Sequence, residues 1–138
     1  MPSLFTTIIA GGIPGSFVVR AERWVALLDI RPSNPGHLLL IPRQERQYLA
    51  DLDAATQADL GPLLCRLTAV VKRATGCPAV NVVVNDGPEA GQEVPHAHLH
   101  LVPRWPGDQK GFRFAGQPYG PGQQDAMCAA LQAAWNAA

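Results

Sequence analysis

The placement of histidine is the feature of this chain that bears most directly on chemistry. Three of its four histidines, His96, His98 and His100, alternate with apolar residues over five positions. Residues 94–104 are predicted to form a β-strand, and because strand side chains alternate between faces, the three imidazoles are expected to point the same way. The fourth, His37, comes directly before an apolar run.

Three interpretations of this cluster are open from the residues alone. The first is a polar sheet face, although imidazole offers no packing advantage at three successive positions. The second is a metal site with His37 as a fourth ligand; against it, same-face positions on one strand lie roughly 6.6 Å apart and seldom converge on one ion. The third is nucleophilic catalysis, in which the middle histidine, His98, attacks a phosphoryl group and its neighbours donate hydrogen bonds to phosphate oxygens.

A polar turn precedes the histidines and extends from Asn85 to Glu93. It contains Gly87 and Gly91, and glycine lets backbone amides approach an anion closely. Gln92 adds neutral donors. The turn is therefore a candidate phosphate cradle for the adjacent histidines.

The run Gly91–Val102 resembles the signature of the histidine triad (HIT) superfamily, in which histidines alternate with hydrophobic residues. The resemblance covers roughly residues 3–108 in unbroken order and includes the segments 8–14, 28–32 and 35–42. It implies an α+β fold with an antiparallel sheet that continues across a homodimer. It also implies nucleotide hydrolase or nucleotidyl transferase activity at the α-phosphate of an adenosine-type nucleotide, closer to diadenosine polyphosphate hydrolase-like bacterial members than to phosphoramidases.

The resemblance assigns roles to individual positions. His98 is the expected nucleophile, which His96 orients, while His100 and His37 bind phosphate or support the nucleophile. Asn85, Gly91, Gln92 and Glu93 occupy the phosphate-contacting stretch. The expected purine-nucleoside site has Asp29 on the ribose hydroxyls and apolar walls from Leu4, Phe5, Ile8, Leu27, Leu28 and Ile30.

Two departures from the family pattern matter. Many members bind a structural zinc ion through a CxxC pair, a later histidine and the first triad histidine, and this chain has Ser3, Thr6 and Glu45 in place of the first three. We therefore expect no metal site and no required cofactor, apart from a divalent cation that the substrate could carry. Glu93 stands where a hydroxyl is common, and its charge would repel a polyanion unless it is protonated or acts as an acid for the leaving group.

Elements that would position these residues follow from periodicity. A hairpin is predicted over residues 17–30, a buried strand over 37–41 and a strand over 79–84. Apolar residues at helical spacing predict one main amphipathic helix between Asp53 as N-cap and Gly76 as stop, which begins near Asp59 or kinks at Pro62. A C-terminal helix is expected to dock through Met127, Leu131 and Trp135.

Length and composition favour a single α+β domain over residues 1–138: a family-like core (1–108), an irregular loop (109–122) and a C-terminal helix (123–138). The formal charge of zero disfavours bulk binding to nucleic acid or anionic membrane. No secretory signal or apolar membrane span is found, and three cysteines without metal-type spacing suit a reducing, cytoplasmic environment.

Two further function classes were weighed against the enzyme. One is a non-catalytic purine-nucleotide-binding module of the same fold, which would bind a nucleoside monophosphate without turnover. The other is a histidine-cluster metal protein, which would carry a stoichiometric transition metal.

Overall fold

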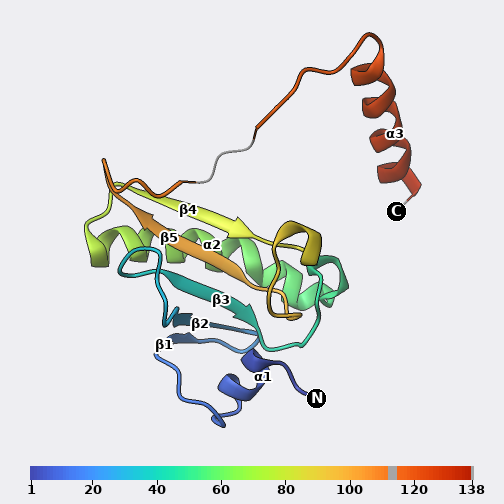
Figure 1. Cartoon of the computed structure of the whole chain (residues 1–138). Helices are drawn as coiled ribbons and strands as arrows, with labels where there is room; N and C mark the ends of the chain where they lie inside the picture. The colour runs from blue at the N-terminus through green and yellow to red at the C-terminus, as the bar shows by residue number, and fades with distance from the viewer. Residues whose placement is uncertain (112–114, 138) are drawn as a thin grey trace.

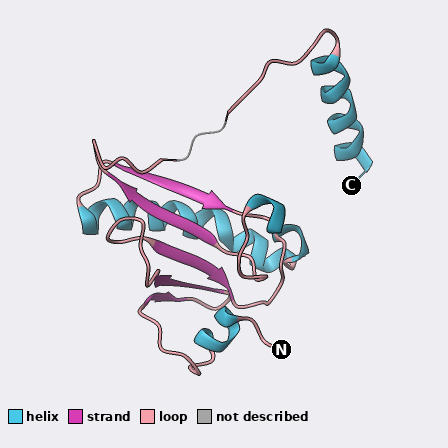
Figure 2. Cartoon of the chain, in the orientation of Figure 1, coloured by secondary structure: helices cyan, strands magenta, loops and turns pink. Residues whose placement is uncertain are grey.

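The computed structural model describes residues 1–111 and 115–137. Its centre is a five-stranded antiparallel sheet in the order β1-β2-β3-β5-β4. The long helix α2 covers one face of this sheet, and the short helix α1 lies at its other side beside β1 and β2 (Figures 1 and 2). The expected α+β class with an antiparallel sheet is confirmed.

The strands β2 (Trp24–Leu28) and β3 (Leu38–Pro42) are almost wholly buried because both of their faces are covered. Side chains on one face, including Trp24, Ala26 and Leu40, join the core beneath α2. Those on the other face, including Val25 and Ile41, pack with Phe5 of α1 (Leu4–Ile9) in a second cluster. Continuous apolar runs are what strands buried on two faces require.

The predicted hairpin and the main helix are present. β1 (Phe17–Arg20) pairs antiparallel with β2. Helix α2 (Ala54–Thr75) is capped by the Asp53 carboxylate, which accepts from the Thr56 N–H, and ends at Gly76 with φ +73°. The expectation of a start near Asp59 is wrong, because the helix begins at Ala54 and includes Pro62 on its exposed side.

The strand that carries the histidines is shorter than predicted. β4 (Ala79–Val84) has the expected bounds, but β5 is Leu99–Arg104, so only His100 of the triad belongs to a strand. Pro95 has no N–H to donate to a ladder. The Ala97 N–H donates to the Arg46 carbonyl, which ties this segment to the chain after β3. The expectation that all three imidazoles share one strand face is therefore corrected.

Helix α3 (Gln123–Ala137) stands away from the sheet in Figure 1. Residues 109–111 and 115–122 contain no helix or strand. The expected docking through Met127, Leu131 and Trp135 is not observed within the described chain, where these side chains are 47%, 64% and 82% exposed. Two short 3₁₀ turns, Leu49–Asp51 and Pro88–Ala90, complete the structure.

Candidate active site

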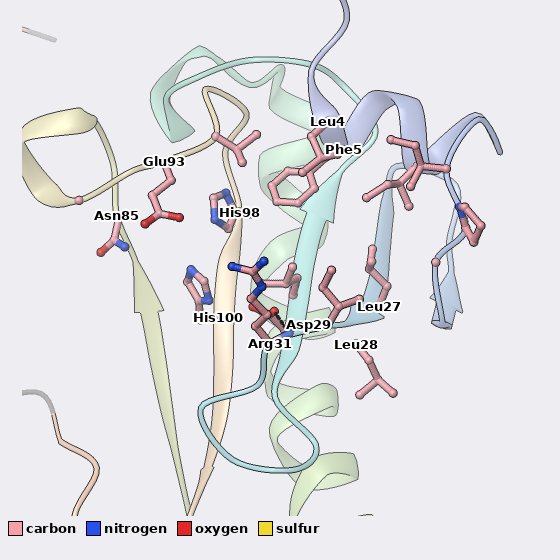
Figure 3. A pocket seen from close by; sticks show the side chains of 18 residues that line it. Leu4, Phe5, Leu27, Leu28, Asp29, Arg31, Asn85, Glu93, His98 and His100 are labelled. Carbon is pink, nitrogen blue, oxygen red and sulfur yellow. Dashed lines mark hydrogen bonds between the residues drawn. The ribbon is translucent and has the colours of Figure 1, made fainter.

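A cavity of about 510 Å³ lies between α1, the ends of β2 and β3, the turn after β4 and the histidine segment. Figure 3 shows its two sides: His98, His100, Asn85 and Glu93 face the apolar side chains of α1 and β2. All seven residues expected around the nucleoside line it: Leu4, Phe5, Ile8, Leu27, Leu28, Asp29 and Ile30. Of the residues expected to act in catalysis or on phosphate, His98, His100, Asn85, Gly91 and Glu93 line it, whereas His37, His96 and Gln92 do not.

The His98 ring is fixed in orientation at the cavity wall. Its Nδ1 lies 2.8 Å from the His96 carbonyl oxygen, which only accepts, so Nδ1 carries the proton. The Nε2 lone pair then has no hydrogen-bond partner in the part of the chain that the structure describes. Phe5 packs edge-on against the ring with centroids 4.8 Å apart, and the residue is 8% exposed. The imidazole held in this orientation presents Nε2, the nitrogen that can act as the nucleophile.

His96 positions this group from the interior instead of lining the cavity. Its Nε2–H donates to the Pro42 carbonyl at 2.7 Å, and its Nδ1 lies 2.6 Å from the Ser3 hydroxyl. The ring is fully buried, and burial is the main cause that lowers its pKa. With both nitrogens bonded, His96 holds its own backbone carbonyl in place, and that carbonyl orients His98.

A chain of hydrogen bonds fixes the tautomer of His100. The Ser33 N–H donates to His37 Nδ1, so the His37 proton must be on Nε2. His37 Nε2 lies 2.9 Å from His100 Nδ1 and donates to it, which leaves the His100 proton on Nε2. Burial, with the nearby imidazoles, lowers the pKa of His100 to about 4, and burial also lowers the pKa of His37. Both rings are therefore neutral at pH 7.

The same arrangement argues against a transition metal at this point. Asp29, His37 and His100 have potential ligand atoms within 4.8 Å of one another. A metal would need the lone pair of His37 Nε2, which carries the proton as long as Ser33 donates to Nδ1. The described geometry thus favours a chain of hydrogen bonds from Ser33 through His37 to His100 over a metal site.

The turn after β4 places its residues in two different roles. Gly91 has φ +94°, a conformation that favours glycine, and lies beside Asn85 on the cavity side. The side chain of Gln92 is turned inward: its amide donates to the Gln47 carbonyl and accepts from the Gly87 N–H. The expectation that the Gln92 side chain contacts phosphate is corrected. Its amide NH2 and its amide oxygen both make hydrogen bonds within the protein, and these bonds stabilise the turn.

Asp29 serves as a turn cap and a cavity residue at once. Its Oδ1 accepts from the Arg31 N–H at 2.8 Å, and Oδ2 lies 3.8 Å from His37 Nε2. A carboxylate oxygen has more than one acceptor site, so the cap leaves Asp29 able to accept from a ligand hydroxyl.

A polar cluster takes the place of the family's zinc ligands. Glu45 accepts from the Thr6 hydroxyl at 2.7 Å and from the Ser3 N–H, while the Ser3 hydroxyl contacts His96 and caps α1 at Thr6. The bonds from Thr6 and Ser3 lower the pKa of Glu45 to about 2. Glu45 and His96 are residue types that bind zinc, but the hydroxyls of Ser3 and Thr6 are not, so the cluster does not supply the four ligands of a structural zinc site. We call Ser3, Thr6, Glu45 and His96 the α1 latch, because they fasten α1 to the end of β3.

Six lining residues were not predicted as site residues: Ile13, Pro14, Gly15, Arg31, Leu39 and Val94. Leu39 belongs to an apolar run and Val94 to the predicted histidine strand, and neither could be told apart from core. Arg31 is the most consequential, since it adds a cation to the cavity. Its position two residues after Asp29 was the only available signal.

Comparison with known proteins gives a consistent result. The family pattern of the HIT domain matches residues 10–107. An adenosine 5'-monophosphoramidase of Schizosaccharomyces pombe is 33% identical over 119 residues, which cover 86% of each chain. A bis(5'-nucleosyl)-tetraphosphatase (asymmetrical) of the same yeast is 34% identical over 85 residues, covering 62% of this chain and 47% of the relative. A Streptococcus mutans crystal structure superposes with a TM-score of 0.86 at 32% identity, covering 94% of this chain and 82% of that one.

Proposed function

Because the chain belongs to the HIT family, we propose that it is a nucleotide hydrolase or nucleotidyl transferase that cleaves adenosine-type nucleotides at the α-phosphate. The observation that carries the proposal is the fixed tautomer of His98, whose Nδ1–H is bonded to the His96 carbonyl and whose Nε2 is free. That nitrogen belongs to a residue lining a cavity that is apolar on one side and polar on the other.

The reaction has two balanced steps through a nucleotidyl-histidine intermediate. In the first, the Nε2 lone pair attacks the α-phosphorus, a P–N bond forms, and the leaving group departs with the electron pair of its own bond to phosphorus. A polyphosphate departs as an anion, whereas an amine leaving group takes up one proton from solvent as its bond to phosphorus breaks. In the second, water attacks the phosphorus and the P–N bond breaks. Nε2 recovers its electron pair, and the proton from water passes to solvent.

The surrounding residues stabilise the charge that develops. His100 Nε2–H is a neutral donor for a phosphate oxygen, held in that state by the relay from His37 and Ser33. The His96 carbonyl faces the Nδ1–H of His98 and stabilises the positive charge that its ring gains. Asn85 and the Gly91 turn approach the same phosphate.

The nucleoside is assigned to the apolar side. Phe5 is buried, whereas Leu4 and Leu28 are 49% and 39% exposed at the rim, a surface that a purine would cover. We assign Asp29 to the ribose hydroxyls, because its carboxylate oxygens can accept from them. The activities in the names of the two yeast relatives support a phosphoanhydride or P–N bond as the cleaved bond. No cofactor is required, and a divalent cation would enter only with the substrate.

A homodimer is part of the proposal. β4 is an edge strand, and no strand within residues 1–111 and 115–137 pairs with its outer side; it is rich in valine, and Val82 is 42% exposed. Long apolar edges invite pairing with another strand, so we assign this edge to a second copy. A reducing, cytoplasmic location remains the expectation. No helix in the described ranges combines the length and apolarity needed to cross a membrane.

The test is release of nucleoside monophosphate from diadenosine polyphosphates and adenosine phosphoramidate, with wild type compared with His98→Ala. We expect turnover of at least one substrate and a loss of several orders of magnitude in the variant, which should still bind adenosine monophosphate. Near-normal turnover by the variant would overturn the mechanism. Binding without turnover in the wild type would favour a binding module instead.

A further inference from the structure

Arg31 is the one Lys or Arg among the residues that line the described cavity. In Figure 3 its side chain extends from the loop after β2 toward the side of the cavity that holds His98 and His100. The Asp29 carboxylate fixes the Arg31 backbone through the 2.8 Å bond to its N–H. No ion pair or side-chain hydrogen bond of this guanidinium is present within residues 1–111 and 115–137.

The other polar groups around the cavity do not supply positive charge. His100 is neutral at pH 7 because burial lowers its pKa to about 4. Glu93, which is exposed at the cavity, carries a carboxylate. A substrate with several phosphates would therefore meet one fixed cation, and arginine remains charged at every relevant pH.

We propose that Arg31 is a specificity-determining residue that binds the phosphates of the leaving group and so favours nucleoside polyphosphates over substrates with an uncharged leaving group. This inference rests on the proposed function. It assigns a leaving-group class, which the histidine arrangement by itself leaves open.

The position of Arg31 relative to the other groups supports this assignment. In an in-line attack, the leaving group departs on the side of the α-phosphorus opposite to His98 Nε2, and Arg31 extends from the loop after β2, across the cavity from the histidine segment. The purine end is occupied by apolar side chains, and Asp29 is assigned to the ribose. Arg31 is exposed and lies two residues beyond Asp29, so its long side chain can reach the phosphates that follow the α-phosphate, and its planar guanidinium can pair with their oxygens.

The experiment compares two substrates that share the adenylyl half. Diadenosine tetraphosphate releases a polyanion, and adenosine phosphoramidate releases ammonia. The kinetic constant is kcat/KM, since it reports on steps up to departure of the leaving group and is independent of the later hydrolysis of the intermediate. The variants are Arg31→Ala, Arg31→Lys and the control Arg66→Ala, which removes an exposed arginine from α2.

For Arg31→Ala we expect kcat/KM on the tetraphosphate to fall about tenfold, the size of one charge-assisted contact at an exposed site. On the phosphoramidate it should change less than about twofold. Arg31→Lys should recover part of the loss, adenosine monophosphate affinity should not change, and Arg66→Ala should match wild type. Added salt should reduce the difference in kcat/KM between wild type and Arg31→Ala on the tetraphosphate, because dissolved ions screen the charge of an exposed guanidinium.

Two results would overturn the inference. If Arg31→Ala lowers kcat/KM equally on both substrates, Arg31 contacts the α-phosphate or the nucleoside instead of the leaving group. If kcat/KM changes on neither substrate, Arg31 is a solvated surface residue. Failure of the proposed function is distinguishable from both. In that case wild type would turn over neither substrate, or His98→Ala would retain activity.

Discussion

Acid should destabilise this protein through its buried histidines, and His100 allows the size of the effect to be worked out. Its pKa falls from 6.5 in the unfolded chain to about 4 in the fold, mainly through burial. Between these values the unfolded state binds a proton that the folded state does not, so the free energy of unfolding decreases as pH falls. Above pH 6.5 both states are neutral and this penalty is absent.

From pH 7 to pH 5, protonation of His100 in the unfolded state lowers the free energy of unfolding by about 2 kcal/mol. Allowing for the partial exposure of His100 reduces this to about 1 to 2 kcal/mol. His37 and His96 also have lowered pKa values and act in the same direction. The lowered pKa of Glu45, about 2, places most of its own contribution at lower pH.

The assay is urea denaturation at pH 7 and pH 5 for wild type and His100→Asn. Asparagine keeps a short polar group that can accept from His37 but does not titrate. Between pH 7 and pH 5, we expect the free energy of unfolding to fall by about 1 to 2 kcal/mol more in wild type than in the variant. Glu89→Gln, which removes an exposed carboxylate, is the control and should behave as wild type. If the free energy of unfolding falls equally in wild type and His100→Asn, the assignment of His100 as a half-buried, neutral ring is refuted.

Three further outcomes are expected. Glu45→Gln should lower the midpoint of thermal unfolding and weaken adenosine monophosphate binding, because the α1 latch holds the helix that carries Phe5. Asp51→Asn is the control for this variant. Unchanged adenosine monophosphate binding by Glu45→Gln would contradict a positioning role for the α1 latch. Val82→Lys should yield monomers by sedimentation equilibrium, whereas Val18→Lys on the opposite edge strand should remain dimeric; a monomeric wild type would refute the pairing at β4. Glu93→Gln should raise kcat/KM on diadenosine tetraphosphate about two- to threefold without divalent cations, and a decrease would instead indicate a leaving-group acid.

Local signals in the sequence predicted the elements well where they are set by neighbours along the chain. Asp53 and Gly76 bound α2 because a carboxylate cap and a left-handed stop act within one turn. The strand at residues 79–84 was readable from its valines. Pro62 was expected near the start of the helix or at a kink, but it lies within α2. Its exposed position lets the helix continue although proline has no backbone N–H to donate.

Partners distant in the sequence decided what the pattern missed. Alternation around His98 suggested one strand face, but His96 is drawn inward by Pro42 and Ser3, residues 54 and 93 positions away. Gln92 was read as a free donor, although Gln47 and Gly87 occupy its amide. The relay that sets the His100 tautomer depends on a backbone N–H at Ser33, which no side-chain pattern reveals.

The central claim is that His98 becomes covalently attached to the nucleotidyl group, and trapping that species tests it most directly. Wild type would be mixed with diadenosine tetraphosphate, quenched in denaturant at alkaline pH to preserve the P–N bond, digested and analysed by mass spectrometry. The account predicts an adenylyl group on the peptide that contains His98, absent in His98→Ala and in wild type mixed with adenosine monophosphate alone. Full turnover with no adduct at any quench time, or an adduct on another residue, would contradict it.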